Sequence, residues 1–347
     1  MSPINFKNFF LENILDFLWG QWSNLGVAGS GRAGGNWIID PEALLVFSLP
    51  MARYEPRFFD EILDWLVENG EFIDIQRLRG IIKNHDENTQ RLISAVACYI
   101  SREAGTQQRK WKALALFRKS DVAIKDEALF KTKEGKPYPK IKAESVIFHE
   151  YMFLREDFLL RKMSRPVSVT APGNLRFLLR ALFGIGSRAE CILYLLTHEA
   201  GHPSEVAGAI GISVRGAQDT LIELAESGLV LTRIKGKRKI EYWLSQNKWW
   251  EFITGIKDQD TKRPTWLNWI ALFSALSNVW AVLNEVEETE SDYMRSSKLR
   301  QAMETISVEF LKSGLSLPPI PGKEVRPERY ETEFRNFITR VLGAGGK

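Results

Sequence analysis

The sequence predicts a mostly helical protein in which two helical domains flank a unit of three helices and a two-stranded β-wing. Apolar residues recur every three to four positions along most of the chain, and one stretch, Val230 to Leu244, alternates like paired strands. A chain of 347 residues with 44% hydrophobic content can bury two or three cores. We expect an N-terminal helical domain at 1–165, the central unit at 166–245 and a C-terminal helical domain at 246–347.

The central unit begins with two short helices. Ser187, followed three residues later by Glu190, matches a capping box and predicts the first helix. Its buried face is expected at Ala189, Ile192, Leu195 and Leu196. Ser204 is expected to cap the second helix, which runs through Ile210. Gly211 can adopt the positive φ that ends it, so a tight turn to a third helix follows.

The third helix is predicted from its cap at Ser213 to about Ser227, before Gly228. Its buried stripe is expected at Val214, Ala217, Leu221 and Leu224. The outward positions are then Arg215, Gly216 and Asp219, with Gln218 at the flank. Two helices joined by a short turn form a helix-turn-helix, in which these outward side chains are the ones that meet a partner.

A strongly basic hairpin follows the third helix. We expect Val230, Thr232 and Ile234 on one strand to pair with Ile240, Tyr242 and Leu244 on the other. The turn is Lys235-Gly236-Lys237. Five of the seven residues from Arg233 to Lys239 are Lys or Arg, whereas residues 166–245 together carry a net charge of only about +2. The positive charge of the unit is therefore concentrated on the wing.

A family resemblance is carried by GHPSEVAGAIGISVRGAQDTLIELAESGLV and the basic hairpin after it. Over about Ser187 to Leu244 the chain resembles the winged helix-turn-helix of bacterial repressors of the ArsR and MarR kind. The resemblance implies that candidate DNA-binding residues are Ser213, Arg215, Gln218, Asp219, Arg233, Lys235, Lys237, Arg238 and Lys239. It further implies a transcriptional regulator without a cofactor that binds double-stranded DNA as a homodimer, on a pseudo-palindromic operator.

An alternative function for the same unit is protein interaction. The third helix carries Asp219, Glu223 and Glu226, and an acidic helix does not favour contact with phosphates. A winged helix can also serve as a scaffold module without DNA specificity, because a fold does not by itself fix a function.

A zinc-protease pattern overlaps the central unit. His198-Glu199-Ala200-Gly201-His202 matches HExxH, in which two histidines one helical turn apart hold zinc and the glutamate activates water. Such a site needs a continuous helix, but Gly201 weakens one and Pro203 biases His202 away from helical geometry. We interpret the five residues as the turn between the first two helices, and a zinc metalloprotease remains a remote alternative.

A glycine-rich stretch near the N-terminus invites a nucleotide-site hypothesis. Gly29 to Gly34 has the spacing of a dinucleotide-binding loop. That loop requires a strand before it and a helix directly after it, whereas here an amphipathic helix precedes. We therefore predict a loop and no nucleotide cofactor.

The N-terminal domain is predicted to contain helices and no sheet. The expected helices are 4–19, 41–49, 56–69, 74–83, 89–103 and 107–119, with a further one at 174–183 leading into the central unit. Asp40 is the expected N-cap of the second helix, and Pro50 its end.

From Ser101 to Lys142 there are twelve Lys or Arg against five Asp or Glu. This excess is either a solvated surface or a second phosphate-contacting surface that flanks the wing.

The C-terminal domain is predicted to contain helices at 248–254, 265–285, 292–312 and 329–342. Trp266 to Leu283 is a run of eighteen uncharged residues, long enough to raise a membrane span. Polar residues interrupt it, and Trp269, Phe273 and Trp280 recur at helical spacing, as core or subunit-contact residues do. We expect a core helix, with a homodimer contact at or near these aromatic side chains.

The two cysteines indicate a reducing compartment, and the sequence motifs do not predict an enzyme. Cys98 and Cys191 are far apart inside apolar helical patterns, so no disulfide is expected. The N-terminal sequence lacks the features of a signal peptide, and we predict a cytoplasmic protein without a membrane anchor. The net charge of +4 neither requires nor excludes a nucleic-acid partner. No catalytic constellation is apparent.

Overall fold

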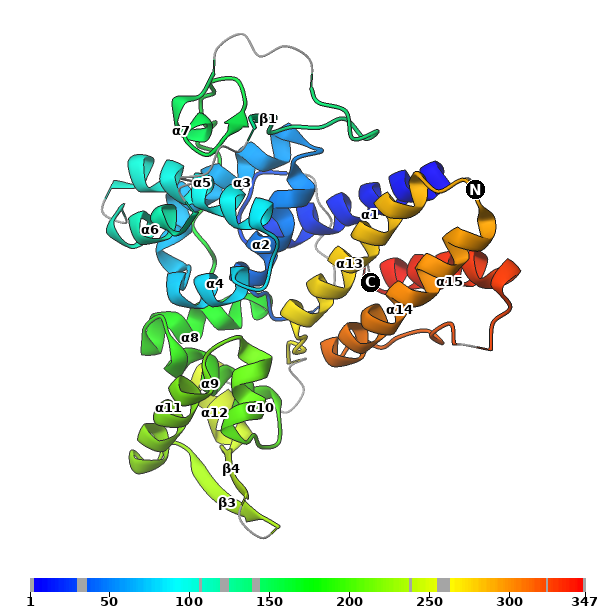
Figure 1. Cartoon of the computed structure of the whole chain (residues 1–347). Helices are drawn as coiled ribbons and strands as arrows, with labels where there is room; N and C mark the ends of the chain where they lie inside the picture. Colours follow the sequence, from blue (N-terminus) through cyan, green and yellow to red (C-terminus); the bar gives the residue numbers. More distant parts are fainter. Residues whose placement is uncertain are drawn as a thin grey trace.

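The computed structural model describes residues 3–29, 36–105, 108–118, 125–138, 144–236, 239–254, 263–322 and 324–345, and over these residues the chain is mostly helical (Figure 1). The glycine-rich stretch predicted to be a loop lies, apart from Gly29, outside the described residues.

The first half of the chain forms α1 (Pro3–Asn24), α2 (Pro41–Ala52), α3 (Pro56–Asn69), α4 (Ile75–Ile82), α5 (Glu87–Glu103), α6 (Gln108–Ala115) and α7 (Val146–His149). Single 3-10 turns lie at Gly70–Phe72, Leu116–Arg118 and Pro172–Asn174. A two-residue parallel pair, β1 (Glu127–Ala128) with β2 (Phe153–Leu154), was not expected, because two residues are too few to show alternation in sequence. The predicted helix over 107–119 also ends early, at Ala115, and tightens into a 3-10 turn.

Pro50 does not end its helix, contrary to prediction. Asp40 caps α2 as expected, by accepting a hydrogen bond from the backbone of Ala43, but α2 continues through Pro50 to Ala52. A proline in the last turn removes only one backbone hydrogen bond. Nearly every residue of α2 is buried, so packing of the helix outweighs that loss.

The second half forms α8 (Leu175–Phe183), α9 (Ser187–Thr197), α10 (Pro203–Ile210), α11 (Val214–Glu226), β3 (Leu231–Lys235), β4 (Lys239–Trp243), α12 (Gln246–Thr254), α13 (Trp269–Glu287), α14 (Asp292–Ser313) and α15 (Pro327–Gly345). We call residues 175–254 the hairpin module and the remaining helices the body. The predicted order of three helices and an antiparallel hairpin is present in α9, α10, α11, β3 and β4.

The buried side chains form two clusters, one mainly in the body and one mainly in the hairpin module. Phe177 of α8 belongs to the first cluster, and Ile38, ahead of α2, belongs to the second. The cluster of the body combines α1 to α5 with α13 to α15; for example, Phe47 of α2 stacks on Phe273 of α13 with ring centroids 4.7 Å apart. Residues 267–345 therefore share a core with the N-terminal helices, which differs from the separate C-terminal domain expected at 246–347. The sequence could not show this, because α1 and α2, which pack on α13 together with α14, lie more than 200 residues earlier.

Among the described residues, α13 is the one helix long and apolar enough to cross a membrane, and its packing identifies it as a core helix. Trp269 and Phe273 are 2% and 3% exposed. The Trp269 indole donates a hydrogen bond to the backbone carbonyl of Ile38 at 2.6 Å. Both side chains are covered within the chain, so the expected dimer contact does not have an exposed face at these two positions.

The basic stretch from 101 to 142 does not flank the hairpin. Figure 1 places β1, within this stretch, at the end of the molecule opposite β3 and β4. Two of its described cations contact the protein itself: Lys110 donates to the carbonyl oxygens of Glu71 and Ile73, and Lys133 pairs with Glu12. Within the described part of this stretch, α6 packs against α4 and α5 and β1 lies at the far end, so the hypothesis of a second phosphate-contacting surface beside the wing is wrong. Parts of it, at 106–107, 119–124 and 139–142, lie outside the described residues.

Candidate nucleic-acid interface

The turn between α9 and α10 caps α10 differently from the prediction. His202 is the N-cap, and its side chain accepts from the backbone of Ser204 while the Glu205 carboxylate accepts from the backbone of His202. Ser204 lies inside the helix, because Pro203 occupies the first helical position and thereby moves the cap one residue earlier. Gly211 ends α10 with a φ of 71°, as predicted.

The capping box predicted at the start of α9 is not formed. Gly186 is the N-cap position of α9 and makes no side-chain cap. The Ser187 hydroxyl instead accepts a hydrogen bond from the Thr220 hydroxyl of α11 at 2.7 Å, and the Glu190 carboxylate binds the guanidinium of Arg180. Both side chains therefore bind partners on other helices and do not cap α9.

The N-cap and the first two turns of α11 present the candidate recognition residues to solvent. Ser213 caps the helix, as predicted, by accepting from the backbone of Gly216 at 3.0 Å. The Arg215 side chain is 92% exposed, with its Nε 3.7 Å from the Asp219 carboxylate. Ser213 and Gln218 are exposed as well. These four residues lie together on the N-terminal half of one helix, where base-reading side chains of such helices are found.

The buried stripe of α11 is shorter than predicted. Ala217, Leu221 and Leu224 are buried, but Val214 is 51% exposed. Helical spacing puts Val214 on the same stripe, yet it is the first residue of α11, and the residues on either side of it are exposed too. The stripe packs against its neighbours only from the second turn onward.

The hairpin has the predicted register. Thr232 pairs with Tyr242 and Ile234 with Ile240, and Gly236 in the turn has a φ of 63°. Tyr242 also exchanges two backbone hydrogen bonds of 2.9 Å with Gly201, which ties the base of β4 to the turn between α9 and α10. Two of the predicted wing contacts, Lys237 and Arg238, lie outside the described residues.

The described cations of the hairpin all have carboxylate partners. Arg233 lies 2.7 Å from Glu199 and 3.0 Å from Glu241, Lys235 lies 2.9 Å from Glu241, and Lys239 lies 2.6 Å from Glu205. The hydrogen bond from Lys235 lowers the pKa of Glu241, and that from Lys239 lowers the pKa of Glu205. The basic hairpin thus carries its own counter-charges, which its dense positive sequence did not reveal.

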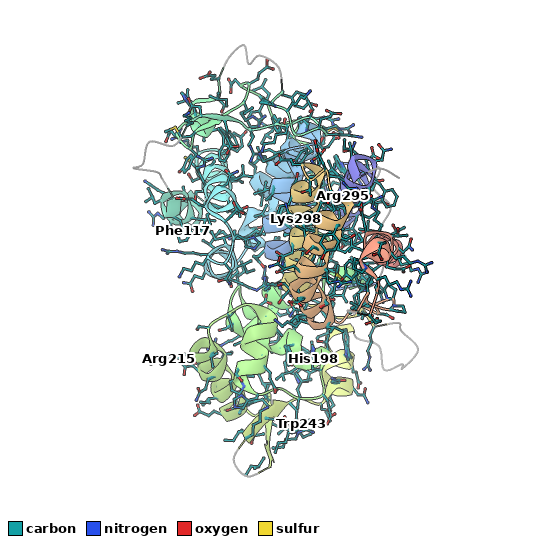
Figure 2. The ribbon with its side chains drawn as sticks, turned by 45° about the vertical axis from the view of Figure 1, so that its right-hand side comes forward. Phe117, His198, Arg215, Trp243, Arg295 and Lys298 are labelled. Atoms are coloured by element: carbon teal, nitrogen blue, oxygen red, sulfur yellow. The ribbon has the colours of Figure 1, made fainter. Side chains whose placement is uncertain are left out.

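Both parts of the candidate interface lie at one end of the molecule. Figure 1 shows α11 and the hairpin at the end away from α7, and Figure 2 shows Arg215 on the outer side of its helix. The structure therefore brings Ser213, Arg215, Gln218 and Asp219 to the same end as Arg233, Lys235 and Lys239.

The HExxH pattern does not lie on a continuous helix. His198 follows the end of α9 in an extended conformation, and His202 precedes α10. The His198 ring stacks on Tyr194 at a centroid distance of 3.9 Å, and burial lowers the pKa of His198. No group of three His, Cys, Asp or Glu suited to a metal occurs among the described residues. In a zinc protease, the i, i+4 spacing of a continuous helix places both histidine rings on one metal. Here His198 and His202 lie at the two ends of a turn, which contradicts that geometry.

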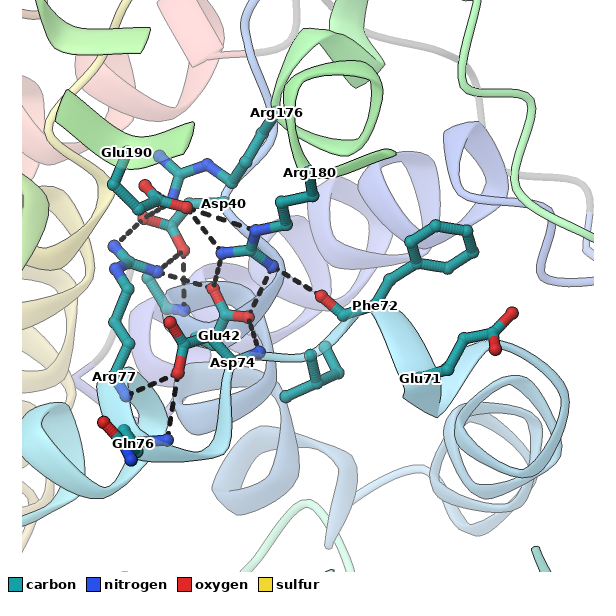
Figure 3. Close-up of polar contacts among 12 residues, drawn as sticks. Asp40, Glu42, Glu71, Phe72, Asp74, Gln76, Arg77, Arg176, Arg180 and Glu190 are labelled. Carbon is teal, nitrogen blue, oxygen red and sulfur yellow. Dashed lines mark hydrogen bonds and ion pairs between the residues drawn. The ribbon is translucent and has the colours of Figure 1, made fainter. Parts of the chain in front are cut away.

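A buried ionic network joins the hairpin module to the body (Figure 3). Its members are Asp40, Glu42, Arg77, Arg176, Arg180 and Glu190, each at most 4% exposed in its side chain. Arg180 of the module lies 2.7 Å from both Glu42 and Glu190, and Arg77 of the body lies 2.6 Å from Glu42. Three cations and three carboxylates balance, as buried charges must.

The turn of the helix-turn-helix is itself held by the body. The Arg77 Nε donates to the carbonyl oxygen of Ile210, the last residue of α10, at 2.6 Å. A Cβ added at Gly211 would lie 2.5 Å from the Ile270 side chain of α13, so no larger residue fits there without displacing it. The position of α11 relative to the body is fixed by these contacts. The sequence around Asp40 and Glu190 predicts only helix caps, because the arginines that complete the network lie on other helices.

The arrangement presents an exposed helix and a basic hairpin at one end of the molecule, attached to the body by buried contacts. Comparison with family models, with curated proteins and with solved structures finds no match for this chain.

Proposed function

We propose that the protein is a sequence-specific DNA-binding transcriptional regulator that uses residues 187–244 as a winged helix-turn-helix. The observation that carries the proposal is the exposed N-terminal half of α11, with Arg215 92% exposed, beside a hairpin at the same end of the molecule. A recognition helix enters the major groove with such residues toward the base edges.

Each candidate residue has a role in this proposal. The planar fork of Arg215 matches the two acceptors of a guanine, and Gln218 matches an adenine. Asp219 accepts from a cytosine amino group or orients Arg215, whose Nε lies 3.7 Å away. The hairpin cations, Lys235 among them, contact phosphates, which position the protein without reading sequence.

The ion pairs of the hairpin are compatible with phosphate binding. Arg233, Lys235 and Lys239 keep side chains that are 42–66% exposed. The Arg233–Glu199 and Lys239–Glu205 pairs are exposed on both sides. Exposed ion pairs contribute only about 0–1 kcal/mol each, so a phosphate can replace the carboxylate in these two pairs at small cost. In this proposal the hairpin cations bind phosphates by exchanging a carboxylate partner for a phosphate, and not by offering unpaired positive charge.

The proposal includes a cytoplasmic homodimer. The two cysteines are free and buried, which suits a reducing compartment. Two-fold symmetry matches a pseudo-palindromic operator. Since Trp269 and Phe273 are covered, the contact between copies must use other side chains.

A second candidate function, docking of a protein partner, is favoured by exposed apolar side chains on the hairpin module. Ile222, Leu229, Leu231, Ile234 and Ile240 are 38–76% exposed. Exposed apolar groups that gather on one unit mark interaction surfaces in soluble proteins. The two functions separate experimentally, because only the first predicts affinity for duplex DNA that falls with salt.

The first prediction concerns the hairpin. Replacing Lys235, Lys237 and Arg238 together with alanine should weaken binding to all duplexes alike. Each lost phosphate contact should reduce the slope of log affinity against log salt by about one. Fluorescence anisotropy over a salt series with cognate and random duplexes measures both effects. Unchanged affinity and slope in the triple variant would remove the hairpin from the interface.

The second prediction concerns specificity. Arg215→Ala should weaken binding to the cognate site by about 1–3 kcal/mol while changing nonspecific affinity little, because a base contact discriminates and a phosphate contact does not. A cognate fragment is first selected from a duplex library with the wild-type protein. Equal losses on cognate and random duplexes would identify Arg215 as a phosphate contact instead. As a folding control, Arg215→Ala must have a circular-dichroism spectrum like that of the wild type. The control is needed because unfolding alone abolishes both kinds of binding, as Leu221→Asp in the buried stripe should.

A further inference from the structure

Two of the carboxylates that pair with the hairpin do not belong to it. Glu199 lies in the turn between α9 and α10 and reaches Arg233 at 2.7 Å. Glu205 lies in the first turn of α10 and reaches Lys239 at 2.6 Å. Each pair joins residues that are 34 positions apart in the chain. The fold therefore brings two negative side chains from another segment onto the cations that we assign to phosphate contacts.

Backbone contacts hold the turn that carries these carboxylates against the base of the hairpin. Gly201 exchanges two backbone hydrogen bonds of 2.9 Å with Tyr242 of β4. A Cβ added at Gly201 would lie 2.6 Å from the Val206 side chain and 2.7 Å from that of Tyr194, so the turn is closely packed against α9 and α10 too. Both carboxylates therefore lie beside the hairpin because of backbone geometry, and not through side-chain attraction alone.

The third carboxylate that pairs with these cations has a different place. Glu241 lies on β4 itself, its side chain is 4% exposed, and it lies 3.0 Å from Arg233 and 2.9 Å from Lys235. The loss of both cations would leave this buried charge without a partner. The side chains of Glu199 and Glu205, by contrast, are 84% and 49% exposed, so water can solvate them when their cations leave. Glu199 and Glu205 are therefore the exchangeable partners.

A carboxylate and a phosphate compete for the same cation, because both are anions that accept its N–H hydrogen bonds. We propose that Glu199 and Glu205 act as built-in competitors of DNA phosphates, and that they thereby set how tightly the hairpin holds any duplex. This inference rests on the proposed function, since it concerns the regulation of the same interface. Phosphate contacts carry no sequence information, so the competition lowers affinity for all duplexes alike and leaves discrimination to the exposed residues of α11.

The double variant Glu199→Gln/Glu205→Gln removes both negative charges with little change in size. Glutamine can still accept the backbone N–H of His202, as Glu205 does at 3.1 Å, so the cap of α10 is retained. We expect the variant to bind a random duplex about three- to tenfold more tightly than the wild type, because two exposed ion pairs no longer have to be broken. Fluorescence anisotropy at fixed ionic strength measures the affinity. Glu199→Gln alone should change it in the same direction without touching the cap.

The matched control is Glu328→Gln/Glu333→Gln on α15, which raises the net charge by the same amount at exposed positions of the body. Figure 1 places α15 away from the hairpin. The control should change duplex affinity little, because salt screens distant exposed charges. An equal gain in both double variants would show a general effect of net charge and overturn the proposal.

A second measurement separates competition from direct repulsion of the duplex by Glu205. In a Lys239→Ala background, Glu205→Gln should leave duplex affinity unchanged, because the cation that it would release is absent. The same gain with and without Lys239 would show direct repulsion, which contradicts competition for a shared cation.

The titrations also distinguish the competition from the proposed function on which it rests. If the wild type binds duplex DNA and the Glu199→Gln/Glu205→Gln variant binds it no more tightly, the competition alone is overturned. If neither protein binds any duplex, the DNA-binding function is overturned and the competition with it.

Discussion

Replacing Arg180 with methionine is expected to lower the free energy of unfolding by about 3–5 kcal/mol, because it leaves three buried carboxylates with only two buried cations. The Arg180 side chain is fully buried, as are those of Glu42 and Glu190, and its guanidinium lies 2.7 Å from each carboxylate. Urea titration followed by circular dichroism measures the change.

Arg188→Met is the matched control in the same module. Arg188 pairs with Glu223 at 2.9 Å, but the two side chains are 60% and 57% exposed. Exposed pairs contribute about 0–1 kcal/mol, so the control should stay close to the wild type. Equal losses of the free energy of unfolding in Arg180→Met and Arg188→Met would show that a buried ion pair contributes no more here than an exposed one.

The same titration repeated at several pH values provides a second readout of the network. Burial by itself would raise the pKa of Glu42, but the guanidinium groups of Arg180 and Arg77 outweigh it and hold that pKa below the ordinary 4.5. A carboxylate with a depressed pKa stabilises the fold above its ordinary value, and the stabilisation is lost as pH falls toward the folded value. The free energy of unfolding of the wild type should therefore decrease as pH falls below about 4.5. In Arg180→Met it should decrease less over the same pH interval, because one of the guanidinium groups that lower the pKa of Glu42 is absent.

Phe273→Ala should lower the free energy of unfolding by about 3–5 kcal/mol, as deletion of a buried aromatic side chain does. Phe273 is 3% exposed and stacks on Phe47 with an interplanar angle of 13°. The loss arises from a cavity between α2 and α13, within one chain. Urea titration at two protein concentrations measures it.

The difference between Phe273→Ala and the wild type should be the same at both protein concentrations, because the contact is intramolecular. A difference that grows on dilution would place Phe273 between subunits instead. Leu311→Ala on α14 is the surface control, since Leu311 is 65% exposed and its truncation should change stability little.

Features fixed by near neighbours in sequence were predictable. The Ser213 cap and the positive φ of Gly211 depend on a few adjacent residues, and both predictions are confirmed. The pairing of Ile234 with Ile240 is likewise confirmed, because a short turn fixes the register of a hairpin.

Features that depend on distant partners were not predictable. Glu190 has the spacing of a capping box, but its counter-charge Arg180 lies on another helix. The hairpin looked like unbalanced positive charge, because Glu199 and Glu205, the partners of Arg233 and Lys239, lie 34 residues away. Of the candidate site, local pattern identified the helix and hairpin, but not the counter-charges or the attachment to the body.

The buried network also determines how the protein can be re-engineered. A chimera that carried residues 175–254 on another scaffold would expose Arg176, Arg180 and Glu190 to a surface without Asp40 or Arg77. Recombination that preserves the contacts must transfer 36–82 as well. Altered recognition is therefore more accessible through substitutions on the exposed side of α11 than through exchange of the whole module.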